Sequence, residues 1–487
     1  MSNYLSAKHI GLVLGPVVFL LLHFDILSLV DNSGDTALGF EVDTLLGITL
    51  WMVIWWMTEA THIAVTALLP LTLFPLLGIT PIKEVTPHYA HPMIYLFFGG
   101  FVIALALERV NLHRRIALNI LKLTGTRADG IILGFMMATT LLSMWISNTA
   151  STVVMLPIAT SVIQLLINDE DGYSKNDRRF ALSILLGIAF AANIGGTATP
   201  IGTPPSVFVI GLLEEQYNIQ ISFAKWMSFG VPFCLVLMGL TYLILVKIIY
   251  PNGLGRLHDS EQLIQIELDK LGKMNRSEIL TAVIFFLAGL SWILRSSLNN
   301  WFDWSLSDTS IAMIAAMLIF VVPFDFKKRK FPLRWLDTSR LPWGILVLFG
   351  GGIALASALD NAGIVDMVGS FIASKSTWSL LLMTVVLIAL VLFMTELIGN
   401  LPLVTVLSPL IAGLAVQINI PLLQILIPTT LAASCAFMLP MATPPNAIVF
   451  ASGHIQVMDM AKAGIILNIV SVILLTILAY FVMPMVF

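Results

Sequence analysis

Long apolar segments separated by short polar loops run along almost the whole of this chain. Apolar runs of roughly 17–25 residues are long enough to cross a bilayer as helices. The predicted spans are 10–30, 44–58, 61–79, 92–108, 181–215, 228–249, 279–296, 309–324, 341–359, 421–457 and 462–485. This pattern predicts an all-α polytopic membrane protein with about 11 transmembrane helices.

Two further apolar segments, 129–166 and 378–417, carry small polar residues at their centres. The first holds Ser147-Asn148-Thr149, and the second holds Thr395 and Asn400. Lipid offers no hydrogen-bond partner at that depth, so these groups require protein, water or a ligand. We therefore predict two re-entrant hairpins whose tips meet over a solute. Small residues such as Ser147 also permit close helix packing, which is the competing interpretation.

The second half of the chain repeats the polar features of the first half in the same order. Phe97-Phe98-Gly99-Gly100 corresponds to Leu348-Phe349-Gly350-Gly351, Asn148 to Asn400, and Thr203-Pro204-Pro205 to Thr443-Pro444-Pro445. The offsets are 251, 252 and 240 residues, and the fall matches a charged loop at 168–179 that is short in the second half. Each repeat thus predicts one hairpin and one interrupted helix, the first interrupted at Gly195-Gly196-Thr197.

The order of the predicted spans makes the two repeats inverted. Five spans lie between the hairpins, and an odd number places the hairpins on opposite sides of the membrane. Inverted repeats with interrupted helices are typical of secondary transporters, whose solute site lies near the midplane. The predicted division is a first half at 1–251, a cytoplasmic connector at 252–278 and a second half at 279–487. Each half supplies scaffold spans, one hairpin and one broken helix.

Composition and charge agree with this assignment. Of the 487 residues, 58% are hydrophobic and only 11% are charged, whereas soluble domains carry about 25% charged residues. With the amino terminus in the cytoplasm, all but four of the 25 Lys and Arg residues fall on the cytoplasmic side. Basic blocks such as 327–330 are then cytoplasmic anchors, and no nucleic-acid partner is expected. The short loops favour a multi-pass protein of a bacterial inner membrane.

The predicted helix ends define an anion site flanked by cation sites. A hairpin tip or a restarted helix exposes free backbone N–H groups and a positive dipole end. Four such ends directed at one cavity bind an anion without a buried Lys or Arg. Asn148 and Asn400 are predicted to cap two of these ends. The other two begin at Thr203-Pro204 and Thr443-Pro444, where proline suits the first helical turn. Unwound carbonyls near Gly195, Gly196 and Ser434 suit Na⁺, a hard cation that prefers oxygen ligands.

These motifs resemble those of the divalent anion/sodium symporter family, the INDY-type carriers of dicarboxylates, citrate and sulfate. The resemblance rests on Ser147-Asn148-Thr149, the two Thr-Pro-Pro motifs and Phe98-Gly99-Gly100, and it covers essentially the whole chain. It implies a homodimer in the lipid bilayer, each protomer having a scaffold domain and a transport domain that moves as an elevator. It also implies that Asn148, Thr149 and Asn400 contact substrate carboxylates. The implied Na⁺ ligands are Ser143, Ser147, Asn148, Gly195, Thr395 and Asn400.

The second tip departs from the pattern of this family. Gly399-Asn400-Leu401 stands where Ser-Asn-Thr is expected, and Pro402 follows. The Leu401 side chain cannot donate a hydrogen bond, and Pro402 removes one backbone N–H. We therefore predict an asymmetric substrate with its anionic end at the first tip and a less polar end at Leu401. A dicarboxylate held mainly by the first tip is the alternative, and the departure also weakens the second Na⁺ site.

The predicted function is Na⁺-coupled symport of a small organic dianion, a C4-dicarboxylate or citrate, by an elevator mechanism. Alternatives on the same scaffold are Na⁺-independent dicarboxylate exchange and a sulfate-type carrier. A membrane enzyme would need a nucleophile–base or metal constellation, and a sensor would need a signalling domain; the sequence indicates neither. His88 and His91 form a close pair with no carboxylate beside them in the sequence. Glu396 either holds its hairpin through hydrogen bonds or binds a proton.

Overall fold

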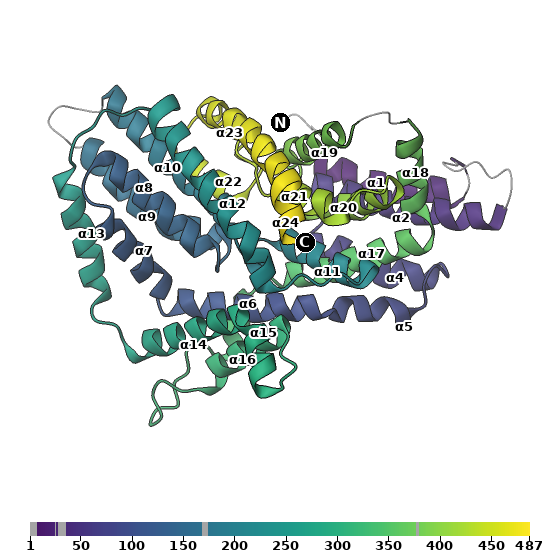
Figure 1. The fold of residues 1–487 in the computed structure, drawn as a ribbon, viewed down its shortest axis with the longest axis horizontal. Coiled ribbons are helices and arrows are strands. Elements are labelled where there is room, and N and C mark those ends of the chain that lie inside the picture. Colours follow the sequence, from purple (N-terminus) through teal and green to yellow (C-terminus); the bar gives the residue numbers. More distant parts are fainter. Residues whose placement is uncertain (1–6, 25, 28–35, 168–173, 376–378) are drawn as a thin grey trace.

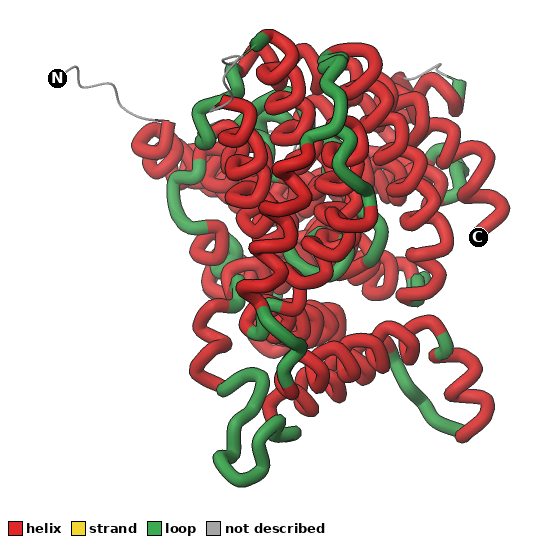
Figure 2. The backbone as a smooth tube through the Cα atoms, turned by 90° about the vertical axis from the view of Figure 1, so that its left-hand side faces the viewer, coloured by secondary structure: helices red, strands yellow, loops and turns green. Residues whose placement is uncertain are grey.

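A computed structural model describes residues 7–24, 26–27, 36–167, 174–375 and 379–487, and within these ranges every secondary-structure element is a helix (Figures 1 and 2). Seven helices are long and apolar enough to cross a bilayer. Their bounds are Ile82–Arg109, Lys175–Gly196, Phe223–Ile249, Arg276–Ile293, Trp343–Asn361, Asn400–Gln417 and Val457–Val486. Shorter apolar helices occupy other predicted spans. The all-α polytopic membrane class is thereby confirmed.

Both predicted hairpins are pairs of helices joined by a tight turn. The first consists of α8 (Ala128–Ser143) and α9 (Asn148–Ile167), and the second of α19 (Leu380–Met394) and α20 (Asn400–Gln417). In each pair the second helix begins at the asparagine that the sequence singles out. We refer to residues 143–149 as the first tip and residues 395–401 as the second tip.

Both predicted interruptions are also present. The first broken helix comprises α10 (Lys175–Gly196), the 3₁₀ turn η2 (Pro200–Gly202) and α11 (Pro204–Tyr217). The second comprises α21 (Leu422–Ala432) and α22 (Pro444–Phe450), with non-helical backbone between them. Each restarted half begins at the first proline of its Thr-Pro-Pro motif, because proline fixes φ and lacks an N–H that the first turn does not need.

The remaining helices surround these four segments (Figure 1). On one side, α10 packs against α8 and α9, and on the other side α18 packs against α20. Helix α6 runs along one edge of the molecule in Figure 1, with α14 and α16 against its outer side. The other elements are α1 (Ala7–His23), α2 (Thr36–Thr58), α3 (Ile63–Thr66), α4 (Leu69–Leu76), α5 (Ile82–Val85), η1 (Thr86–Ala90), α6 (Pro92–Arg109), α7 (Leu112–Leu123), α12 (Phe223–Leu243), η3 (Ile244–Ile249), α13 (His258–Leu271), α14 (Arg276–Ile293), α15 (Arg295–Phe302), α16 (Asp308–Val321), η4 (Trp335–Arg340), α17 (Trp343–Asn361), α18 (Ile364–Lys375), α23 (Val457–Ile477), η5 (Leu478–Val482) and α24 (Met483–Val486).

Several predicted boundaries are wrong. The first span ends at His23, and α2 begins at Thr36, inside the loop that separates the predicted spans 10–30 and 44–58. The connector 252–278, expected to be a loop, contains α13, whose apolar residues Leu263 and Leu268 pack against the core. In the predicted loop 168–179, α10 starts at Lys175, because Ser174 and Asp177 form a reciprocal N-terminal cap. Residues 28–35 and 168–173 of these loops lie outside the described residues.

Candidate functional site

The first tip is fastened to the first broken helix by one hydroxyl group. The Oγ of Ser143 lies 2.6 Å from Oδ1 of Asn148 and 2.7 Å from the carbonyl oxygen of Ala192 in α10. Ser143 is completely buried, whereas Ser147 and Thr149 are exposed at the turn. Three oxygen atoms from the tip and the broken helix therefore meet at one point.

The second tip repeats this arrangement with different residues. The Oγ1 of Thr395 lies 2.9 Å from Oδ1 of Asn400 and 2.8 Å from the carbonyl oxygen of Ala433, just after α21. Thr395 is completely buried. A hydroxyl, an amide oxygen and a carbonyl oxygen of the other element again converge. The substitutions around Asn400 have thus left the second oxygen cluster intact.

Each oxygen cluster has two short oxygen–oxygen contacts but only one hydroxyl proton to form a hydrogen bond. A serine or threonine hydroxyl carries a single proton, yet the oxygens of Ser143 and Thr395 each approach two acceptors. One of the two short oxygen–oxygen contacts in each cluster therefore lacks a proton. Converging neutral oxygens of this kind are the ligands that hard cations prefer. Both clusters are suited to Na⁺.

Glycine lets the first broken helix approach the tip this closely. A Cβ added at Gly196 would lie 2.6 Å from Oδ1 of Asn148, and a Cβ added at Gly195 would lie 2.5 Å from the carbonyl oxygen of Thr140. At either distance a neighbouring atom would have to move: a side-chain end at Gly196 and the backbone at Gly195. Gly195, a predicted Na⁺ ligand, therefore lies against the helix that carries Ser143, and its neighbour Gly196 lies against Asn148.

The tips are capped differently from the sequence-based prediction. Asn148 and Asn400 were expected to cap helices, but both are the first helical residues, and their amide oxygens face Ser143 and Thr395. The cap of the first tip is Ser147, whose Oγ accepts from the N–H of Ala150 at 3.2 Å. At the equivalent place Gly399 makes no side-chain cap. The second helix end consequently keeps its first N–H groups without a side-chain acceptor.

The threonines of the Thr-Pro-Pro motifs face inward. Thr203 and Thr443 are both buried, whereas Pro204 is partly exposed and Pro444 is exposed. The hydroxyl of Thr443 accepts from the N–H of Asn446 and caps α22. The threonine side chains are therefore engaged within the protein, and the outer face of each helix start is formed by proline.

Glu396 holds the unwound part of the second broken helix. Its carboxylate is buried and accepts from the N–H groups of Phe437, Met438 and Leu439, at 2.8–3.1 Å. Asn468 of α23 donates a further bond at 2.8 Å. Three consecutive N–H groups that the helix break leaves unpaired thus receive one acceptor group. Of the two roles predicted for Glu396, this geometry supports the hydrogen-bonding role.

Leu401 occupies a different place from its counterpart in the first tip. Thr149 is exposed at the turn, whereas Leu401 is only 7% exposed and belongs to the apolar core. The prediction that Leu401 meets a less polar end of the substrate requires an accessible side chain. In this structure, that side chain packs inside the protein.

Sequence reasoning did not predict the contacts that join the two repeats, and it gave Asn193 no role. Nδ2 of Asn193 lies 3.1 Å from Oγ1 of Thr443, and Oγ1 of Thr203 lies 3.3 Å from Oγ of Ser434. These contacts link residues more than 200 positions apart, so hydropathy could not reveal them. The position of Asn193 two residues before the Gly195-Gly196 break was the available signal.

Trp145, within the first tip, packs against aromatic rings of other helices. Its ring stacks near Phe223 and Trp292 and meets Phe285 edge-on at a centroid distance of 5.0 Å. Phe285 and Trp292 belong to α14, outside the hairpin. The first tip therefore has an aromatic contact with a neighbouring span. The equivalent residue of the second tip, Leu397, is exposed.

The histidine pair has an acidic partner that the sequence separation concealed. Glu215, near the end of α11, places its carboxylate 3.7 Å from Nδ1 of His88 and 3.4 Å from Nε2 of His91. Among the described residues, no group of three or more His, Cys, Asp or Glu side chains is placed to hold a metal ion.

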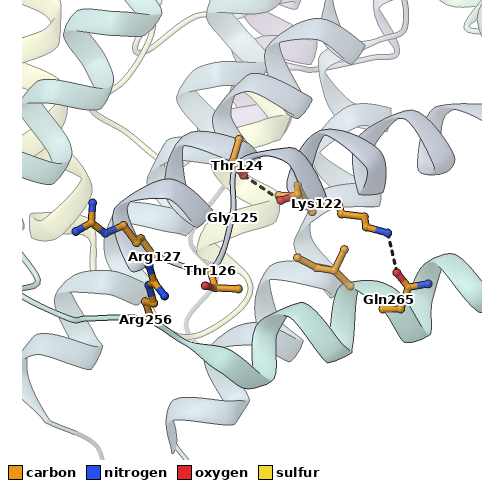
Figure 3. Close-up of a pocket in the computed structure, with 9 residues that line it drawn as sticks. Lys122, Thr124, Gly125, Thr126, Arg127, Arg256 and Gln265 are labelled. Atoms are coloured by element: carbon orange, nitrogen blue, oxygen red, sulfur yellow. Dashed lines mark hydrogen bonds between the residues drawn. The ribbon is translucent and has the colours of Figure 1, made fainter.

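A cavity of about 400 Å³ lies away from the tips, between the end of α7, the start of α8 and α13 (Figure 3). Lys122, Arg127 and Arg256 line it, and Lys122 donates to Gln265 at 3.0 Å. None of its lining residues is acidic. These side chains belong to the basic segments that the charge distribution assigns to the cytoplasmic side, so this cavity is distinct from the predicted solute site.

Comparison with known proteins gives consistent results. Residues 36–487 match the family described as the sodium:sulfate symporter transmembrane region. The chain is 38% identical over 488 residues to a sodium-dependent dicarboxylate transporter, SdcS, of Staphylococcus saprophyticus, covering 99% of this chain and 93% of the relative. It is 40% identical to the SdcS protein of Staphylococcus aureus, covering 99% and 92%.

Two solved structures share the fold at low sequence identity. The YdaH transporter of Alcanivorax borkumensis aligns with a TM-score of 0.56 and 12% identity, covering 82% of this chain and 88% of that one. The MtrF protein of Neisseria gonorrhoeae aligns with a TM-score of 0.54 and 14% identity, covering 83% and 84%. At these identities the likeness concerns the fold alone.

Proposed function

The chain belongs to the sodium:sulfate symporter family, and from this membership we propose that it is a secondary transporter that carries a dicarboxylate anion together with Na⁺. Its relatives named as sodium-dependent dicarboxylate transporters match almost the whole chain. Na⁺ and the anion are both substrates in this reaction, and no bond is made or broken. The protein is a transporter and not an enzyme.

The observation that carries this proposal is the duplicated oxygen cluster. Ser143, Asn148 and the Ala192 carbonyl form the first cluster, and Thr395, Asn400 and the Ala433 carbonyl form the second. In each cluster the hydroxyl is completely buried, the oxygens are uncharged, and one proton is missing. A Na⁺ ion in either cluster would satisfy the surplus oxygen lone pairs. Ser147, in the same tip, and Gly195, whose Cβ position lies 3.0 Å from Cβ of Ser143, complete the proposed ligand set.

The anion is proposed to bind at the helix ends beside these ions. Helices α9, α20, α11 and α22 begin at Asn148, Asn400, Pro204 and Pro444, and their first N–H groups and positive dipole ends face away from their own helices. Asn148, Thr149 and Asn400 are the proposed carboxylate ligands. Bound Na⁺ adds positive charge at the same ends, so anion binding should strengthen with Na⁺ concentration. Thr203 and Thr443 would position these ends from inside, with Pro204 and Pro444 at the surface.

Na⁺-independent exchange is the main alternative on this scaffold. It was prompted by the altered second tip, because the loss of serine and threonine around Asn400 was expected to weaken the second ion site. The Thr395–Asn400–Ala433 cluster nevertheless has nearly the same distances as the first cluster. This equivalence favours two ion sites, and hence symport.

The mode of movement and the assembly are proposed on the family resemblance. The hairpins and broken helices would form the moving transport domain, with the other spans as scaffold, in a homodimer. The contact of Trp145 with α14 would then join the two domains. A bacterial inner membrane and a cytoplasmic amino terminus are proposed from the loop lengths and the charge distribution.

Uptake by purified protein in liposomes tests the function. Labelled succinate would be followed with an inward Na⁺ gradient, or with internal succinate and no gradient, with citrate and sulfate as competitors. We expect uptake only with the Na⁺ gradient. Ser143→Ala and Thr395→Ala should each raise the Na⁺ concentration for half-maximal uptake about tenfold, since each removes a ligand oxygen and a buried hydrogen bond.

Ser161→Ala is a matched control for these variants. Ser161 lies on α9, away from the tip, and its hydroxyl bonds only to the Pro157 carbonyl of its own helix. Its Na⁺ dependence should equal that of the wild-type protein. Uptake driven only by internal succinate would replace symport with exchange, and uptake blocked by sulfate but not by citrate would change the substrate class.

A further inference from the structure

We infer that Asn193 and Ser434 are positioning residues that couple the ion cluster of each repeat to the anion-facing helix start of the other repeat. This inference rests on the proposed function, since it concerns how bound Na⁺ strengthens anion binding. The two residues bind neither the ion nor the anion directly. In the sequence, Asn193 comes directly after Ala192 and Ser434 directly after Ala433, the residues whose carbonyl oxygens complete the two ion clusters.

The first connection runs from the first tip to the second repeat. Ser143 contacts the carbonyl of Ala192, and the next residue, Asn193, reaches the second broken helix. Its Nδ2 lies 3.1 Å from Oγ1 of Thr443, 3.2 Å from the Ala436 carbonyl and 3.3 Å from Oδ1 of Asn446. Thr443 caps α22, so Asn193 holds the residue that starts this half-helix.

The second connection runs in the opposite direction and is the symmetry equivalent of the first. Thr395 contacts the carbonyl of Ala433, and the next residue, Ser434, places its Oγ 3.3 Å from Oγ1 of Thr203. Thr203 is the residue before α11, as Thr443 is before α22. Both repeats therefore contain the same chain of contacts. The hydroxyl of a tip contacts a backbone carbonyl, and the side chain of the next residue contacts the threonine of the other repeat.

Ordinary packing does not account for the way Asn193 is placed. An amide nitrogen carries two protons, yet Nδ2 of Asn193 faces three oxygens. Its own Oδ1 is buried and has no hydrogen-bond partner among the described residues. The amide is therefore held through its nitrogen alone, and that nitrogen fixes the position of Thr443 relative to Ala192.

The consequence is reciprocal coupling between ion and anion. Na⁺ in the first cluster would fix the Ala192 carbonyl, hence Asn193, and hence the start of α22. Na⁺ in the second cluster would fix Ser434 and the start of α11. An ion that raises anion affinity by some factor must itself be bound tighter by that factor when the anion is present. Loss of either connecting side chain should reduce this factor.

Succinate binding to the purified full-length protein measures the factor directly. The dissociation constant for succinate would be determined by calorimetry at low and at saturating Na⁺, with choline keeping the ionic strength constant. We expect the ratio of the two constants to fall about tenfold in Asn193→Ala and in Ser434→Ala, within the usual range for coupled sites. Asn193→Ser, which installs the residue type of the other repeat, should retain part of the ratio.

Two control variants remove buried hydroxyls from the same helices. Ser183 on α10 bonds to the Tyr250 carbonyl, and Thr430 on α21 bonds to a carbonyl of its own helix. Ser183→Ala and Thr430→Ala should keep the wild-type ratio. Asn193→Ala that weakens succinate binding by the same factor at both Na⁺ concentrations would overturn the inference, because that result describes a packing defect.

A second measurement separates this inference from the proposed function. If the succinate dissociation constant of the wild-type protein did not change with Na⁺ concentration, Na⁺ coupling itself would be refuted. A double-mutant cycle of Asn193→Ala and Thr443→Ala, read by thermal unfolding in detergent, needs no transport or ligand. We expect the two changes to be non-additive, since each removes the same contact. Additive effects would overturn the connection whatever the substrate.

Discussion

Replacing Gly196 by alanine should impair Na⁺ binding while leaving the fold in place. The added methyl group would lie 2.6 Å from Oδ1 of Asn148 and 3.1 Å from the Gly202 carbonyl. The nearest of these atoms is the end of a side chain, so the Asn148 amide can turn away at moderate cost. Turning it breaks the 2.6 Å contact with Ser143 and removes the amide oxygen from the first cluster.

The magnitude follows from these two changes. To bind Na⁺ as before, the Asn148 oxygen must return against the added methyl group, or the ion must bind without that oxygen. Either way the bound state loses about one polar contact, about 1–2 kcal/mol, which corresponds to a roughly 5- to 30-fold rise in the Na⁺ dissociation constant of the first site. We therefore expect the half-saturating Na⁺ concentration for succinate uptake to rise strongly in G196A proteoliposomes, with a smaller change in the maximal rate at saturating Na⁺.

Two other glycines serve as controls. Gly239 in α12 has open space at its Cβ position, so Gly239→Ala should leave Na⁺ dependence unchanged and stabilise slightly, by about 0.4–1 kcal/mol. A Cβ at Gly195 would meet backbone atoms of Thr140, so Gly195→Ala should lower thermal stability as well as activity. Wild-type Na⁺ dependence in a folded G196A protein would refute the assignment of Asn148 to an ion cluster.

Two further predictions concern Leu401 and Glu396. Leu401→Thr should lower stability by about 1–2 kcal/mol, since it replaces a buried apolar side chain, and should leave the order of succinate, citrate and sulfate as competitors unchanged; an altered order would instead favour the asymmetric-substrate hypothesis. Glu396→Gln should destabilise the protein in thermal unfolding by about 3 kcal/mol, because an amide nitrogen would face backbone donors, and normal stability with normal uptake would argue against the hydrogen-bonding role.

The sequence predicted the hairpins and the broken helices well because their signals are local. Polar residues inside a long apolar run, and a Thr-Pro-Pro motif after a glycine pair, each restrict the backbone within a few residues. The helix starts at Asn148, Asn400, Pro204 and Pro444 follow from those signals. Helix α13 was missed because it is a polar connector, in which length and hydropathy give no membrane signal.

The contacts at the tips were harder to predict because they depend on side-chain distances between separate helices. Asn148 looked like a helix cap, yet its amide is turned toward Ser143, and Ser147 provides the cap instead. Leu401 looked like part of a binding surface, yet its helix turns it into the core. His88 and His91 seemed to lack an acidic partner because Glu215 lies more than 100 residues away in the chain.

The sequence by itself determined the membrane class, the two repeats, the family and the residues from which ion sites can be built, because hydropathy, proline and glycine act over short stretches. The tertiary structure decided which oxygens converge: Ser143 with the Ala192 carbonyl, Thr395 with the Ala433 carbonyl, and Asn193 with Thr443. Those partners are brought together by the packing of helices that are distant in the chain. A cation site requires several oxygens at one point, and that requirement is met only when the helices are assembled.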